Sequence, residues 1–179
     1  MGKRPGRVYR EPQRPWTRTA VRKPHKAYVK GVRNPVIRLF NMGSKKKGEC
    51  NIRVDLLADR KMQIRDEAIE AARVNANKSM VNKVGKENYA FKIRVYPHQC
   101  LRKNAMAMGA GADRISSGMR LSFGRPCGRA AIVNKNQKIM SIWTTEEHKE
   151  MARKALKKAN SKLPGSNDVR VEEVENVAE

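Results

Sequence analysis

Acidic residues, aromatic residues and long apolar segments are all scarce in this sequence. Its 179 residues include only 17 Asp and Glu against 40 Lys and Arg, which leaves a formal charge of +23. A compact chain with that charge repels itself, so we expect a polyanionic partner, either nucleic acid or an anionic membrane surface. The sequence has no run of 18 apolar residues, and its basic start lacks the apolar core of a signal peptide. These absences favour a soluble intracellular protein that does not cross a membrane.

Residues that commonly carry catalysis or bind metals are also few. The three cysteines are far apart and form no CxxC pair, so we expect reduced thiols rather than a disulfide framework or a zinc site. None of the three histidines lies in a recognisable triad or zinc motif. Two pairs of neighbouring acids, Asp66–Glu67 and Glu146–Glu147, stand where helices are expected to begin, and the helix dipole favours acids there. We therefore predict no catalytic residue, no metal and no cofactor. The cysteines and histidines are Cys50, Cys100, Cys127, His25, His98 and His148.

Residues 1–34 are expected to form an extended basic arm. The segment 1–33 holds eleven Lys and Arg, four prolines and one acid, and it shows no apolar period. Alone, such a segment cannot bury enough surface to offset the entropy of ordering. Aromatic rings are interleaved with arginines, which suits stacking on RNA bases and gripping phosphates; a merely soluble tail is the alternative. The predicted RNA-binding residues of the arm are Arg4, Arg7, Tyr9, Arg10, Arg14, Trp16, Arg18, Arg22 and Lys23.

Strand patterns recur through residues 35–167, which we interpret as one folded body. Short alternating or apolar runs predict strands at 36–40 and 50–57. The clearest alternation lies at 89–97, where three apolar side chains face one way and two cations and a tyrosine face the other. Two short strands are expected within 130–143, on either side of the turn NKNQ.

Helix patterns occur twice in the same body. An i, i+4 row of apolar residues predicts a helix at 64–84. A second helix is expected at 145–163, with Thr144 and Glu147 as a capping box before it. After this helix comes a final strand-like run, DVRVEEV, in an acidic tail of residues 168–179.

The segment 98–131 has the composition of a phosphate-binding loop. It contains five of the twelve glycines, six Lys and Arg, and one acid. Glycine lets backbone N–H groups approach phosphates, and arginine forms bidentate contacts with them. Gly109-Ala-Gly111 does not complete a dinucleotide fingerprint, because Arg114 stands at the third glycine, and no P-loop is present. A finger ordered by RNA is the favoured interpretation. Its predicted RNA-binding residues, with Arg94 on the outward face of the preceding strand, are Arg102, Lys103, Asn104, Gly109, Gly111, Arg114, Met119, Arg120 and Arg125.

Five motifs in the chain resemble one known family, the large-subunit ribosomal proteins called L10e in archaea and eukaryotes and related to bacterial L16. The likeness runs from about residue 3 to 165, and the archaeal branch is the most similar. The pattern AGADR…GMR…FG.P.G is specific to the family rather than to basic loops in general. The motifs are GRVYR (6–10), EAIEAARVNANK (67–78), FKIRVYPHQCLRKN (91–104), GAGADRISSGMRLSFGRPCGRAA (109–131) and KIMSIWT (138–144).

The resemblance implies an α+β fold, with helices packed on a mixed or antiparallel sheet of the α/β-hammerhead type. It implies a structural protein of the cytoplasmic large ribosomal subunit, with rRNA and neighbouring ribosomal proteins as partners and no membrane. The family binds rRNA beneath the central protuberance, and a mobile loop, here 102–117, reaches toward tRNA and the peptidyl transferase region. Three residues depart from the family pattern: Lys103, Ala105 and Arg129.

Overall fold

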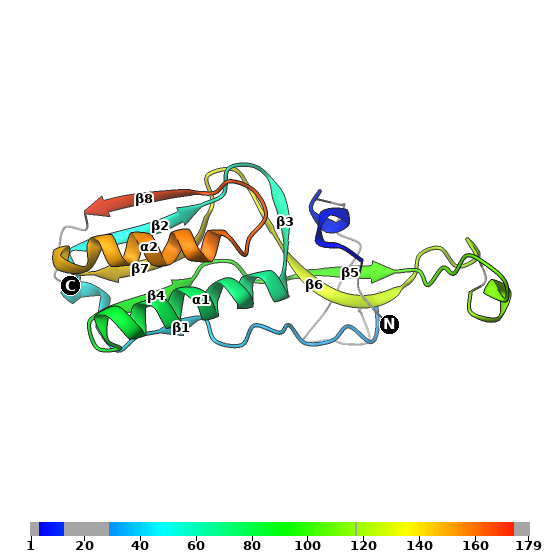
Figure 1. The fold of residues 1–179 in the computed structure, drawn as a ribbon, viewed down its shortest axis with the longest axis horizontal. Coiled ribbons are helices and arrows are strands. Elements are labelled where there is room, and N and C mark those ends of the chain that lie inside the picture. Colours follow the sequence, from blue (N-terminus) through cyan, green and yellow to red (C-terminus); the bar gives the residue numbers. More distant parts are fainter. Residues whose placement is uncertain (1–3, 13–28, 117, 174–179) are drawn as a thin grey trace.

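A computed structural model describes residues 4–12, 29–116 and 118–173 of the chain (Figure 1). The main sheet is antiparallel, and its five strands are arranged in the order β1-β4-β7-β2-β8. At its centre, Ile142 lies opposite both Val54 and Phe91. The strands are β1 (Asn41–Met42), β2 (Ile52–Leu57), β4 (Tyr89–Ile93), β7 (Lys138–Thr144) and β8 (Asp168–Glu173).

Two helices, α1 (Asp66–Val84) and α2 (Lys149–Asn160), lie side by side on one face of this sheet (Figure 1). Small residues on both helices, such as Ala72 and Ala155, are fully buried, which lets the helices pack closely together. The sheet supplies larger side chains, including Phe91, to the same core. This layered core is the main apolar cluster of the described residues, and helices on one sheet face define an α+β fold.

A second, three-stranded antiparallel sheet has the order β3-β6-β5. Its strands are β3 (Met62–Arg65), β5 (Gln99–Lys103) and β6 (Arg125–Val133). One end of β6 joins the main core through Ala131 and Val133. The other end extends away from the helices with β5, as the right-hand part of Figure 1 shows. Short 3₁₀ turns complete the described elements: η1 (Gly6–Tyr9), η3 (Lys47–Glu49), η4 (Ala112–Arg114) and η5 (Glu146–His148).

The structure confirms the predicted α+β class and both predicted helices. The predicted alternation after β4 is also confirmed, because Val95 is buried while Arg94 and Tyr96 are exposed. The strand predicted at 36–40 is wrong. In that segment Ile37 is buried, and the carbonyl of Phe40 accepts a hydrogen bond from Ile93 N at 2.8 Å. Residues 36–40 do not form a strand of either sheet.

The predicted capping box is wrong as well. Thr144 ends β7, and its hydroxyl lies 3.4 Å from the carbonyl oxygen of Asn88. Thr145 is the residue before η5, and its side chain makes no capping hydrogen bond. Thr144 therefore pairs in the sheet, although the local sequence pattern assigned it to the cap of the following helix.

One segment that the sequence analysis interpreted as a loop contains strands. The stretch 98–131, interpreted as one loop, contributes β5 and the first half of β6. The strand-like run predicted at the start of the acidic tail is confirmed, because residues 168–173 form β8 and pair with β2 along its full length. The division into arm, body and tail stays a prediction, but the main sheet includes the first six residues of that tail. Neither helix in the described ranges is long and apolar enough to cross a bilayer.

Candidate nucleic-acid interface

The end of the β5–β6 hairpin projects from the body as a finger, defined here as residues 104–124 (Figure 1). Lys103 and Arg125 are the last paired residues at its base. A register shift between Leu101 and Arg102 bends the hairpin just before this point. The loop predicted at 102–117 therefore needs corrected bounds: Arg102 and Lys103 belong to β5, and the irregular segment continues to Gly124.

Gly124 allows the two sides of the finger to meet at its base. Its φ of +75° lies in the left-handed region. A Cβ built there would lie 2.6 Å from both the N of Asn104 and the carbonyl carbon of Lys103. The close approach of these two backbones therefore requires glycine at this position.

Arg102 and Phe123 lie on opposite sides of the base of the finger and contact each other there. The Arg102 guanidinium donates to the carbonyl of Phe123 at 2.7 Å, and its Cζ lies 3.8 Å from the centre of the Phe123 ring. This cation–π contact leaves Phe123 half-exposed. The pair presents a flat ring and a cation at one place, a combination that suits a nucleotide.

The tip of the finger is held by backbone and small polar groups rather than by a core. Asn104 Nδ2 donates to the Gly118 carbonyl at 3.1 Å, and the Ser116 hydroxyl accepts from Ala107 N at 3.2 Å. Four large apolar side chains of this region are at least two-thirds exposed. They are Met108 (94%), Leu121 (83%), Ile115 (73%) and Met119 (67%). Such a concentration of exposed apolar surface indicates a binding surface.

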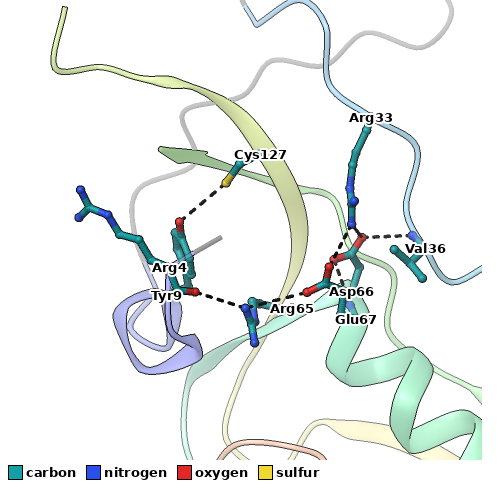
Figure 2. Close-up of polar contacts among 8 residues, drawn as sticks. All are labelled: Arg4, Tyr9, Arg33, Val36, Arg65, Asp66, Glu67 and Cys127. Carbon is teal, nitrogen blue, oxygen red and sulfur yellow. Dashed lines mark hydrogen bonds and ion pairs between the residues drawn. The ribbon is translucent and has the colours of Figure 1, made fainter. Parts of the chain in front are cut away.

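The N-terminal turn η1 packs against the second sheet through Tyr9. The ring is 6% exposed and lies in a small cluster with Leu101, Ala130 and Cys127. The Tyr9 hydroxyl and the Cys127 thiol are 3.7 Å apart (Figure 2). Burial is the main cause that raises the pKa of Tyr9, and the contact with Cys127 raises this pKa further. The prediction that Tyr9 stacks on RNA bases is therefore corrected, because its ring is already covered by protein.

Backbone contacts hold the same turn in register with β3. Gln63 donates from its backbone N to the Arg10 carbonyl at 2.8 Å and from Nε2 to the Tyr9 carbonyl at 3.1 Å. Arg65 donates to the Arg4 carbonyl at 3.4 Å (Figure 2). With the backbone fixed, the side chains of Arg4, Arg7 and Arg10 are all exposed. Tyr9 is thus an anchor that fixes where three predicted RNA-binding arginines emerge.

A buried carboxylate at the start of α1 fixes the chain where the arm meets the body. Asp66 is fully buried, and one of its oxygens accepts from Val36 N at 3.1 Å and from Arg33 at 3.4 Å (Figure 2). Its other oxygen accepts from Glu67 N at 3.0 Å. Arg129 on β6 donates to the Arg33 carbonyl at 2.8 Å. Asp66, one of the paired acids noted in the sequence, is therefore structural.

Two open cavities lie along the hairpin. The first has a volume of about 380 Å³ and lies between the N-terminal turn and the base of the finger. The second, of about 550 Å³, lies within the finger. Of the predicted RNA-binding residues, the first cavity brings together Arg4, Tyr9, Arg102, Lys103, Asn104 and Met119, and the second brings together Lys103, Asn104, Arg114, Arg120 and Arg125.

The remaining predicted residues lie elsewhere. Gly109 and Gly111 are exposed on the finger, both with positive φ. Arg94 is exposed on the segment after β4, where its Nε donates to the Ser141 hydroxyl at 3.0 Å and its guanidinium covers Trp143 at 5.2 Å. Five predicted residues lie outside the described residues: Arg14, Trp16, Arg18, Arg22 and Lys23.

Sequence reasoning missed the role of Phe123. Its position next to Gly124 gave no local signal, because the contact with Arg102 depends on the pairing of β5 with β6. Reasoning also missed a group of aromatic rings near Tyr96, which come from separate segments of the chain.

The cysteines agree with the expectation of reduced thiols in or near a core. All three are free; Cys50 and Cys100 are buried, and Cys127 is partly buried. Burial raises the pKa of the Cys50 and Cys100 thiols, which lowers their reactivity. Within the described part of the chain, no group of three or more His, Cys, Asp and Glu side chains could hold a metal ion.

Comparison with known proteins gives consistent matches. The family model described as "Ribosomal protein L16p/L10e" matches residues 16–170. A protein of Archaeoglobus fulgidus named "Large ribosomal subunit protein uL16" is 44% identical over 96% of this chain and 94% of its own length. Proteins of the same name from Methanococcus aeolicus and Methanocella arvoryzae are 47% and 43% identical. The first covers 92% of this chain and 91% of its own length, and the second covers 96% of each.

Proposed function

The chain belongs to the ribosomal protein L16p/L10e family, and we propose that it is a constituent of the cytoplasmic large ribosomal subunit that binds the subunit's rRNA. As a ribosomal protein of this family it is a structural protein and not an enzyme. Its partners are then rRNA and neighbouring ribosomal proteins. The names of its relatives and its charge of +23 support this proposal.

The finger carries the second part of the proposal: it reaches toward tRNA and the peptidyl transferase region beside the aminoacyl-tRNA site. The observation that supports a binding role is the exposure of four large apolar side chains beside arginines, outside the three buried apolar clusters of the described residues. Arg114 and Arg120 on the finger are exposed, and only Asp113 opposes them within it. A cationic and apolar surface without a core of its own suits contact with folded RNA.

The N-terminal turn and the finger then have different roles in RNA binding. Arg4, Arg7 and Arg10 are displayed on a turn anchored by Tyr9, so they are positioned to hold rRNA phosphates close to the body. The finger extends past that point and can contact a second RNA. The proposal therefore separates assembly, which depends on the body and its N-terminal turn, from tRNA binding, which depends on the finger.

Shortening the finger tests this separation. Residues 105–123 are replaced by Asn-Gly, a pair that favours the tight turn of a two-residue hairpin, so that Asn104 and Gly124 stay in place. We expect the shortened protein to enter large subunits, because the turn, both sheets and the core are untouched. Binding of tRNA at the aminoacyl site should fall by at least tenfold.

The measurements are co-sedimentation of the protein with large subunits and filter binding of aminoacyl-tRNA to purified ribosomes. Replacing only Ala110, an exposed residue of the finger, by Ser serves as a control that keeps both the length of the tip and its four exposed apolar side chains. Normal tRNA binding by ribosomes that contain the shortened protein would refute the role of the finger. Absence of the full-length protein from large subunits would refute the proposal as a whole.

A further inference from the structure

The extended segment after β4 exposes the side chains on one of its two sides. The side chains on its other side are buried. Arg94, Tyr96 and His98 alternate along this extended segment and are all exposed, whereas Val95 and Pro97 between them are buried. The buried residues fix the segment to the body. The exposed ones present a guanidinium, a phenol ring and an imidazole ring in succession.

Three rings form a continuous aromatic patch, defined as Phe40, Tyr96 and His98. The centres of the Phe40 and Tyr96 rings are 5.5 Å apart, and their planes are 25° from parallel. The Tyr96 and His98 ring centres are 4.6 Å apart, with a 50° tilt. Tyr96 joins the other two rings, and it is still 42% exposed.

The patch is held in place before any ligand arrives. Phe40 comes from a distant part of the sequence, and its carbonyl accepts a hydrogen bond from Ile93 N at 2.8 Å, which fixes the two segments beside each other. Because the rings already restrict one another, a ligand that stacks on them pays little for ordering side chains. Phe40 is partly buried against the main core, so Tyr96 and His98 form the exposed part of the patch.

Two cations on the segments that carry the patch indicate which kind of ligand it takes. Arg94 is fixed by Ser141 and Trp143, and Arg38, two residues before Phe40, is exposed. Exposed rings that share their segments with cations favour a planar ligand attached to an anion. An apolar peptide side chain would use the rings but would offer the cations no anion.

We propose that the aromatic patch stacks on an unpaired RNA base while Arg94 contacts an adjacent phosphate. This inference rests on the proposed function, since the RNA is then part of the rRNA that the protein binds. Tyr96 and His98 lie directly before β5, so the patch adds a base-stacking site at the root of the hairpin that carries the finger. Its recognition is tolerant of sequence, because every base has a flat face.

The test compares two probes on the full-length protein: a fluorescent RNA heptamer of adenosines and a heptamer of the same ribose–phosphate backbone without bases. Moderate salt weakens the phosphate contacts that both probes share. Tyr96→Ala should weaken binding of the adenosine probe by about 5- to 150-fold, the usual range for loss of one stacked base. It should leave binding of the base-free probe unchanged.

Matched variants separate stacking from other effects. Tyr96→Phe keeps the ring and should bind like the wild type, and Leu39→Ala removes an exposed apolar side chain that is not a ring. His98→Ala, at the end of the patch, gives a second reading if Tyr96→Ala does not fold. Ultraviolet crosslinking in purified large subunits should attach a nucleotide to the peptide that contains Tyr96 and His98.

The possible failures are distinguishable. Equal loss of both probes, or no loss of either, in the ring variants would overturn the stacking site while leaving rRNA binding intact. A crosslink from this peptide to another protein would also overturn it. Failure of the wild-type protein to bind either probe or to enter large subunits would instead contradict the proposed function.

Discussion

Substituting alanine for Gly124 should open the base of the finger without unfolding the body. At a φ of +75°, an alanine costs about 1 kcal/mol because its Cβ is crowded in the left-handed region. That Cβ would also lie 2.6 Å from two backbone atoms of the opposite side, so the backbone must move. Overpacking of this kind costs about 1–3 kcal/mol. The sum of about 3 kcal/mol corresponds to a roughly 150-fold change in the local opening equilibrium.

Gly111→Ala is the matched control for this substitution. Gly111 has a φ of +73°, almost the same as Gly124, but a Cβ built there meets nothing within 4 Å. It therefore carries the conformational cost without the collision. The difference between the two variants isolates the effect of the close backbone approach at the base of the finger.

Hydrogen exchange of the full-length protein measures the local effect. The amides of Lys103 and Arg125, the last pair of the hairpin, should exchange about 150-fold faster in Gly124→Ala and at the wild-type rate in Gly111→Ala. Circular dichroism checks that the body stays folded. Equal exchange at this pair in both variants would refute the argument that Gly124 closes the finger.

Two further predictions concern the body. Although burial opposes it, hydrogen bonds and positive charge from Arg53 and Lys138 hold the pKa of Glu172 below its ordinary value of 4.5. The resulting stabilisation is present above pH 4.5 and is lost as the pH falls through the lower folded-state pKa. In urea denaturation, the difference in unfolding free energy between the wild type and Glu172→Gln should therefore shrink between pH 7 and pH 3; a constant difference would contradict this. For the N-terminal anchor, Tyr9→Ala should cost about 3 kcal/mol of unfolding free energy because a buried ring is lost, whereas Tyr9→Phe should cost less than about 1 kcal/mol because the thiol of Cys127 is a weak partner. Equal costs for the two Tyr9 variants would contradict the anchoring by ring burial.

Local sequence patterns predicted the elements of the main sheet that lie over the helices. Strands β2, β4 and β7 and both helices have one face in the common core, so their apolar residues repeat with the period of the element. The segment 36–40 also looked like a strand, but only Ile37 is buried there. Its apolar residues serve other contacts, including that of Phe40 with Tyr96, which no periodicity reveals.

Apart from the end of β6, which lies in the strand predicted before the turn NKNQ, the second sheet could not be predicted in the same way. The first half of β6 contains Pro126 and Gly128, which disfavour strands, and β5 lacks a clear alternation. These segments form strands because they pair with each other and with β3. The same is true of Tyr9. The composition of the arm predicted an extended segment, and its burial depends on a surface that exists only after β5 and β6 have paired.

Strand β6 explains how a finger without a core of its own can have a fixed base. Its final residues, including Ala131 and Val133, are buried in the main core, while Ala130 lies in the Tyr9 cluster and Arg125 is exposed beside the finger. One continuous strand thus passes from the core, through the contact with the N-terminal turn, to the finger. The direction of the finger is set by backbone pairing that is anchored at the far end of the strand. Changes at the tip can alter RNA contacts at little cost to the fold, whereas changes near Ala131 would affect both.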